Sequence, residues 1–185
     1  MELIIVLVVI AVTAFLFYVT INNSLVALKQ QVAKAWANID VILKQRFDEV
    51  PQLIEVINQY VQHEKNILTT IAEARKEYGT ARNEAEKMRA NQTFSSALPA
   101  IFALGENYPE LKSNHNFVQL QRRISELEES LSHRREHYNE SVTIYNTRIE
   151  QFPSSLVARQ LGYTEKNLFQ VADSEKVRPD LKINV

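Results

Sequence analysis

Leu3–Ile21, with the sequence LIIVLVVIAVTAFLFYVTI, decides how the rest of the chain is interpreted. The stretch contains no charged residue, no glycine and no proline, and its only polar interruptions are Thr13, Tyr18 and Thr20. A helix of about 20 such residues crosses the roughly 30 Å hydrocarbon core of a bilayer, because an α-helix rises about 1.5 Å per residue. A threonine hydroxyl can bond back to its own helix, so Thr13 and Thr20 cost little there. The sequence therefore predicts a transmembrane anchor in residues 1–22.

Two other classes of segment share this apolar composition. A cleaved signal peptide has a basic leader, a shorter apolar run and a cleavage site of small residues, whereas Met1-Glu2 precede this run and Asn22-Asn23 follow it. A core helix of a soluble protein shows a polar stripe, and none is present here. The spanning helix is therefore the preferred interpretation.

The basic residues near the apolar run predict its orientation. No Lys or Arg precedes the run, whereas Lys29 and Lys34 follow it closely. Because Lys and Arg are enriched on the cytoplasmic side of a membrane span, we expect the N-terminus outside and the C-terminal domain in the cytoplasm. The bias is small, and a domain on the periplasmic or extracellular side is the alternative.

Apolar residues after the anchor follow heptad spacing, which predicts a long amphipathic helix reaching Tyr78. Two rows carry the pattern: Leu25, Val32, Ile39, Leu53, Tyr60 and Ile67, and Trp36, Leu43, Val50, Ile57, Ile71 and Tyr78. Pro51 lies inside this pattern and cannot donate to the carbonyl four residues back, so we expect a kink or break between Phe47 and Pro51. Gly79 is expected to end the helix.

Three further helices are predicted downstream. The first contains Phe94 and Leu104, with an interruption at Pro99 and an end at Gly105. The next runs from Phe117 to Phe152 and carries an apolar or aromatic residue at every seventh position. A short last helix spans about Leu156 to Leu161. Its expected cap is Ser154 or Ser155, its expected end is Gly162, and Ser113 or Asn114 is expected to cap the helix from Phe117.

These patterns predict an all-α fold, with an N-terminal transmembrane helix and an elongated antiparallel, coiled-coil-like bundle of three long helices plus a short fourth. We divide the chain into an anchor at residues 1–22, a helical bundle at residues 23–162 and a C-terminal tail at residues 163–185. With only three glycines and five prolines, the chain has few of the residues that many short strands and turns require.

Composition limits the functions that this chain can have. The 21 Lys and Arg residues nearly balance the 22 Asp and Glu residues, and no clustered basic stretch predicts nucleic-acid binding. The chain contains no cysteine, which removes disulfides, thiolate metal sites and cysteine nucleophiles. No glycine-flanked serine predicts a catalytic elbow, and the three glycines are too far apart to form a phosphate-binding loop. We therefore expect no catalytic residues, no cofactor and no metal.

Two short motifs carry alternatives. His133 and His137 match the H-x-x-E-H pattern and would place two imidazoles one helical turn apart, as a zinc site requires. Arg134 and Arg135 put two positive charges beside that position, and the heptad places Arg134 nearer the core than the histidines. We therefore favour a solvated helix face over a metal site.

The second motif is a repeated Tyr-Asn pair, Tyr138-Asn139 and Tyr145-Asn146, seven residues apart. The tyrosines are expected in the core, with their hydroxyls bonded to polar partners. The asparagines either fix the register against a facing helix or are simply exposed.

Five segments of the chain resemble the LemA family of bacterial single-pass membrane proteins. They are NSLVAL at 23–28, AWANIDVILKQRFDEVPQLI at 35–54, His63-Glu64 with Ala74-Arg75, ENYPELKSN at 106–114, and the Tyr-Asn pairs with Phe152-Pro153. Gln45 departs from the family, whose members often have a basic residue there. The resemblance implies an N-terminal anchor in the bacterial cytoplasmic (inner) membrane, a long helical bundle and no assigned catalytic activity.

Three hypotheses for function follow. The first is a non-enzymatic structural or interaction protein anchored in the lipid bilayer, whose bundle associates with further copies at the membrane, because anchoring raises the local concentration of copies. The second is an accessory or sensor subunit of another membrane complex, with unknown protein partners. The third and least favoured is a metal-dependent enzyme using His133 and His137.

Overall fold

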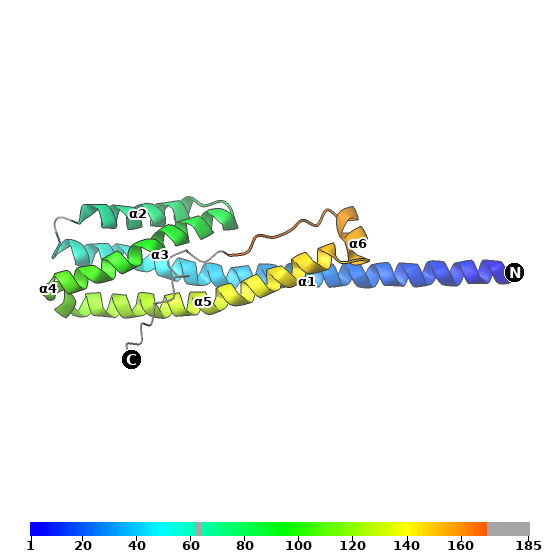
Figure 1. The fold of residues 1–185 in the computed structure, drawn as a ribbon, viewed down its shortest axis with the longest axis horizontal. Helices are drawn as coiled ribbons and strands as arrows, with labels where there is room; N and C mark the ends of the chain where they lie inside the picture. Colours follow the sequence, from blue (N-terminus) through cyan, green and yellow to red (C-terminus); the bar gives the residue numbers. More distant parts are fainter. Residues whose placement is uncertain (62–63, 170–185) are drawn as a thin grey trace, which may run out of the picture. The chain divides into compact units, whose positions relative to one another are not determined.

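The computed structural model describes residues 1–61 and 64–169, and these residues form helices and connecting segments without a β-strand (Figure 1). The all-α prediction is therefore confirmed. The helices of the described residues are α1 (Glu2–Asn58), α2 (Lys65–Thr80), α3 (Glu84–Asn107), α4 (Pro109–Ser113), α5 (His115–Glu150) and α6 (Ser154–Gln160). Two compact units can be distinguished, and α1 and α5 contribute to both.

The first unit contains residues 1–39 and 134–168. Its core is built from Leu25, Val32 and Ile39 of α1, Tyr138, Val142 and Tyr145 of α5, and Val157 and Ala158 of α6. The Trp36 ring meets the Tyr138 ring edge-on, with 5.7 Å between the ring centroids. The N-terminal part of α1, from Leu3 to Phe17, is exposed along its whole length.

The second unit contains residues 40–133 and, at the end of the described chain, Phe169. Helices α2 and α3 pack along each other. The apolar core draws on α1 to α5 and includes Phe47, Ile57, Ile71, Phe94, Leu111 and Phe117.

The prediction of one long helix reaching Tyr78 is wrong, because α1 ends at Asn58 and a separate helix, α2, carries Ile67, Ile71 and Tyr78. The heptad spacing of apolar residues continues across the break between α1 and α2, so the spacing alone does not reveal where α1 ends.

Pro51 does not break α1. A proline cannot donate to the carbonyl four residues earlier, and here that carbonyl belongs to Phe47. The Arg75 Nε of α2 donates to the Phe47 carbonyl oxygen at 3.2 Å and replaces the missing donor. A side chain from a neighbouring helix thus allows the proline to remain inside a continuous helix.

The predicted interruption at Pro99 and end at Gly105 are also wrong, because α3 runs through both residues to Asn107. Pro99 lies on the exposed face, where water can solvate the carbonyl that has lost its donor. Gly105 is buried, and a Cβ built there would lie 3.0 Å from the Phe117 ring. The glycine therefore permits close packing of α3 against α5 rather than ending a helix.

Some of the predicted helix caps are present in the structure and others are not. Asn114 is confirmed as a cap, because its Oδ1 accepts from the Phe117 backbone N–H at 3.0 Å. Gly162, with φ of 69°, ends the last helix as predicted, and the Tyr163 N–H donates to the Ala158 carbonyl at 3.0 Å. Ser154 and Ser155 do not cap α6, because Pro153 occupies the N-cap position and makes no side-chain bond there. Of the predicted tail, residues 170–185 lie outside the described residues, as does His63.

Candidate functional site

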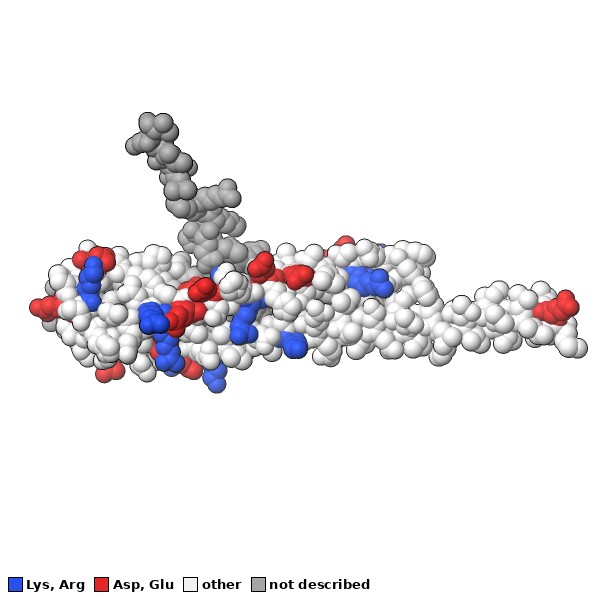
Figure 2. Space-filling view, turned by 90° about the horizontal axis from the view of Figure 1, so that it is seen from below, with Lys and Arg blue, Asp and Glu red and all other residues white. Residues whose placement is uncertain are grey.

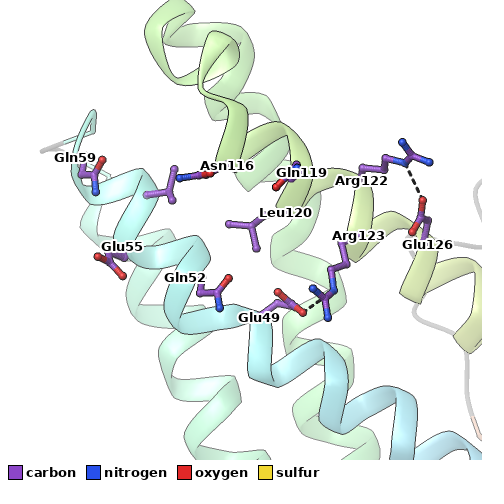
Figure 3. Close-up of a pocket in the computed structure, with 11 residues that line it drawn as sticks. Glu49, Gln52, Glu55, Gln59, Asn116, Gln119, Leu120, Arg122, Arg123 and Glu126 are labelled. Atoms are coloured by element: carbon purple, nitrogen blue, oxygen red, sulfur yellow. Dashed lines mark hydrogen bonds and ion pairs between the residues drawn. The ribbon is translucent and has the colours of Figure 1, made fainter.

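A polar groove of about 590 Å³ lies between α1 and α5 in the second unit (Figure 3). Amide and charged side chains dominate its lining, which consists of Glu49, Gln52, Glu55, Val56, Gln59, Asn116, Gln119, Leu120, Arg122, Arg123 and Glu126. Residues three, four or seven apart lie on one face of a helix, which is why both helices present their polar side chains to the same space. Amide groups donate and accept hydrogen bonds, so the groove suits a polar partner such as a peptide main chain.

Charge pairing limits what this groove can do chemically. The Glu49 carboxylate, whose side chain is only 8% exposed, accepts from Arg123 Nε at 2.8 Å. The Glu126 carboxylate pairs with Arg122 at 2.9 Å (Figure 3). Two of the three lining carboxylates are thus neutralised by arginine, and the lining supplies no His, Ser or Tyr side chain. The arrangement favours binding over acid–base or nucleophilic catalysis.

A buried arginine lies deeper in the same unit. Arg46 of α1 is fully buried and forms an ion pair with Glu128 of α5. It also donates to Asn91 and, at 3.0 Å, to the Ser95 hydroxyl of α3, and its guanidinium lies 4.3 Å from the centre of the Phe94 ring. A buried charge is tolerated only when it is paired and hydrogen-bonded. The network therefore joins α1, α3 and α5 at one point.

The sequence pattern did not predict this network. Arg46 directly precedes Phe47 within an apolar stripe, and an arginine at such a position signals either a helix edge or a buried pair. Its partners lie 45 and 82 residues away in the chain, which no local pattern can identify.

A second polar cluster surrounds Asp40 in the same unit. Its carboxylate accepts from the Tyr78 hydroxyl at 2.9 Å and from Lys87 Nζ at 2.7 Å. Burial raises the pKa of Tyr78 well above its usual range, and the hydrogen bond to the Asp40 carboxylate raises it further. The Tyr78 ring stacks on Phe47 with 4.5 Å between centroids. The cluster is a packed structural contact between α1, α2 and α3.

The Tyr-Asn pairs of α5 hold an extended segment in the first unit. The hydroxyls of Tyr138 and Tyr145 donate to the backbone carbonyls of Asn167 and Thr164 at 3.1 and 3.0 Å. The Asn146 amide bonds to both backbone groups of Lys166: its Nδ2 donates to the carbonyl and its Oδ1 accepts from the N–H, each at 2.9 Å. The tyrosines are in the core with bonded hydroxyls, as predicted. Asn146, however, binds an extended segment and not a facing helix.

All four of these hydrogen bonds end on main-chain atoms, so the side chains of residues 164–167 are not selected by them. Burial raises the pKa of Tyr145, with a smaller contribution from neighbouring Tyr163, and this keeps the hydroxyl protonated as a donor. Asn139 is half-buried on the same helix. We call residues 138, 145 and 146 the main-chain clamp.

His133 and His137 are both exposed on α5. His137 Nδ1 lies 3.9 Å from the Glu140 carboxylate, one turn along the same helix. Within residues 1–61 and 64–169, no group of three or more His, Asp or Glu side chains is gathered as metal ligands. The buried member of the neighbouring pair is Arg135 and not Arg134, which the heptad had placed nearer the core.

Comparison with known proteins identifies relatives along most of the chain. The model of the protein family described as the LemA family matches residues 35–183. Protein LemA of Metamycoplasma hominis is 23% identical over 167 residues, which are 90% of this chain and 76% of that protein. Magnetosome protein MamQ 2 of Paramagnetospirillum magneticum is 28% identical over 95 residues, 50% of this chain and 35% of that protein.

Magnetosome protein MamQ of Magnetospirillum gryphiswaldense is 20% identical over 173 residues, 80% of this chain and 64% of that protein. The match to MamQ 2 of Paramagnetospirillum magneticum spans only about a third of the length of that relative. Neither the family description nor the names of these relatives state a reaction. Because the family match covers most of the sequence, including the Arg46 network and the main-chain clamp, the chain belongs to the LemA family.

Proposed function

We propose that this protein is a non-enzymatic interaction protein anchored in a membrane by α1, with a helical domain that associates with further copies at the membrane surface. The observation that carries the proposal is the exposed apolar run Leu3–Phe17, which continues as unbroken helix into the folded domain. Among the described residues, α1 is the one helix long and apolar enough to cross a membrane.

The chemistry of this run supports a lipid environment. Figure 2 shows that the N-terminal part of α1 carries no basic side chain, with acidic atoms only at its tip, whereas charged side chains gather on the rest of the face shown. The Thr13 and Thr20 hydroxyls donate to the Val9 and Leu16 carbonyls at 2.8 and 2.9 Å, so they need no water. A continuous apolar surface of this size is unfavourable in water and satisfied in a bilayer.

The proposed location of the protein rests on this anchor. The proposed arrangement is residues 1–22 as a single span in the bacterial cytoplasmic membrane, residues 23–162 as the helical bundle in the cytoplasm, and residues 163–185 as the tail. Lys29 and Lys34, directly after the span, support this orientation. A domain on the other side of the membrane is the alternative.

Self-association has to use surfaces that the fold leaves open. Leu25, Ile39 and Leu53 of the heptad row are fully buried within one chain, so the row itself is not available to a second copy. The polar groove between α1 and α5 remains open and offers amide donors and acceptors. Copies confined to one membrane meet at high effective concentration, so even a weak contact through such a groove would populate oligomers.

The test is the mass of the intact protein in mild detergent, measured by light scattering with correction for bound detergent. A discrete assembly of more than one chain supports self-association. A monomer at every concentration contradicts it and favours the second candidate, an accessory or sensor subunit, which is then sought by co-purification. Gln52→Ala/Gln119→Ala in the groove, with Lys112→Ala as an exposed control outside it, shows whether the groove forms the contact.

A further inference from the structure

Three exposed hydrophobic side chains lie in α6 or within two residues of its ends, in the first unit. Phe152 is 80% exposed, Leu156 is 60% exposed and Leu161 is 44% exposed, and among the described residues after position 17 the first two are the most exposed large hydrophobic side chains. The opposite side of α6 is packed, with Ser154, Val157 and Ala158 buried. The helix is thus held on the domain by one face, and its exposed face carries Leu156 beside Arg159 and Gln160.

We call these three residues the α6 patch, and the segment that carries them comes close to the end of the apolar run of α1. A small surface groove is lined by Asn22 and Lys29 of α1 together with Leu161, Gly162 and Tyr163, which places the end of α6 beside the first residue after the run. Figure 1 shows α6 next to α1 where the bare N-terminal part of that helix begins. Both elements belong to the same compact unit.

The length of the bare helix indicates how deep this region lies. Leu3–Phe17 is exposed, while Tyr18 and Val19 are half-buried and Ile21 is buried by the domain. About 15 exposed residues span roughly 22 Å, which is about 8 Å short of a hydrocarbon core of roughly 30 Å. The turn Tyr18–Ile21 adds about 6 Å and brings the run close to this thickness, so the protein packed around that turn reaches the membrane boundary.

The polar residues around the patch match the chemistry of that boundary. Arg159 of α6 and Lys166 are exposed, and Lys29 lies 5.6 Å from the centre of the Tyr163 ring. Basic side chains suit lipid phosphates, and aromatic rings with polar tips are enriched at the level of the headgroups. Apolar side chains beside cations are the composition of helices that lie in a membrane surface.

We propose that Phe152, Leu156 and Leu161 insert into the boundary layer between headgroups and acyl chains of the same bilayer that α1 spans. The inference rests on the proposed membrane anchor and adds a second point of attachment. A single span leaves a domain free to swivel and tilt, whereas a span and a neighbouring surface contact fix its orientation.

The absence of cysteine from the chain permits a test by single-cysteine labelling of the full-length protein. An environment-sensitive fluorophore is attached at Leu156→Cys, at Val9→Cys in the span, and at Val118→Cys, a 48% exposed apolar position on α5 in the second unit. The protein is reconstituted in vesicles of phosphatidylcholine and phosphatidylglycerol. Quenching is measured with iodide in the water and with a nitroxide carried on the lipid chains.

We expect iodide to quench the label at 156 several-fold less than the label at 118, and the lipid nitroxide to show the opposite order. Labels at 156 and 118 that are equally accessible to iodide, with the label at 9 protected, would overturn the surface contact while leaving the anchor intact. A label at 9 that iodide quenches freely would overturn the anchor itself. Protection at 156 from both quenchers would assign the patch to protein contact and also overturn the proposal.

Discussion

The two compact units are stabilised by different kinds of polar contact. The second unit is joined at a buried charge, Arg46, whose ion pair and hydrogen bonds connect three helices inside an apolar core. The first unit holds its extended segment through uncharged hydroxyl and amide groups that bond to main-chain atoms. The removal of a buried charge partner costs far more than the removal of a neutral hydrogen bond, so the two units should respond very differently to single substitutions.

The largest effect is expected from Arg46→Met. The substitution removes the buried guanidinium that pairs with Glu128 and donates to Asn91, and we expect a loss of about 3 kcal/mol in the free energy of unfolding. Denaturant unfolding followed by circular dichroism measures this loss. Arg122→Met is the matched control, since its ion pair is exposed and should contribute less than about 0.5 kcal/mol. Equal losses in the two variants would show that the buried network does not stabilise the second unit.

A smaller effect is expected from Arg75→Leu, which removes the donor to the Phe47 carbonyl. The expected loss is about 1–2 kcal/mol, because that carbonyl has no helical donor while Pro51 is present. Pro51→Ala restores an N–H to α1, so Arg75→Leu should cost much less in that background. Unfolding of all four members of this double-mutant cycle measures the coupling. Strict additivity would contradict the assigned role of Arg75.

Asn146→Ala tests the main-chain clamp of the first unit. We expect a loss of about 1 kcal/mol in local stability, seen as faster hydrogen exchange at the Lys166 amide. Exchange in the second unit, for example at the amides of α3, should not change. Unchanged exchange at Lys166 would mean that the segment is held by its side chains.

The smallest effect concerns the Tyr78 hydroxyl and alkaline pH. Its pKa is raised in the folded protein, so above the unfolded value of about 10 the unfolded chain loses this proton first and is favoured. Stability should therefore fall as pH rises above about 10, and below that pH the group should have no effect. Tyr78→Phe should make the fall above about pH 10 less steep, as measured by denaturant unfolding at a series of pH values. An identical slope in both proteins would refute this assignment.

Features that depend on local periodicity were predictable from the sequence. The apolar run, the helical class, the helix from Phe117 and the stop at Gly162 each follow from residues close together in the chain. The interruption at Pro99 and the end at Gly105 were misjudged, and Pro51 does not break α1, because the effect of each residue depends on tertiary neighbours: access of water, an aromatic ring of α5, and a guanidinium from α2. The turn after Asn58 was missed because the apolar rows of α1 and α2 face one common core.

The same distinction applies to the candidate sites. The Tyr-Asn repeat was recognisable as a repeat, but its ligand, an extended backbone about 20 residues away, was not. The groove and the Arg46 network combine residues from helices far apart in the sequence. Spacing within one helix carries no information about which helix lies opposite.

The main-chain clamp also matches the spacing of residues along α5 to the spacing of residues along the extended segment. Between Tyr145 and Tyr138 the helix advances seven residues, about 10.5 Å, while between Thr164 and Asn167 the extended chain advances three residues, about 10 Å. The two lengths are nearly equal, so the heptad from Tyr138 to Tyr145 matches three residues of the extended segment. Substitutions in residues 164–167 should consequently be tolerated, whereas inserting or deleting one residue between Thr164 and Asn167 would prevent both carbonyls from meeting their tyrosine donors at once.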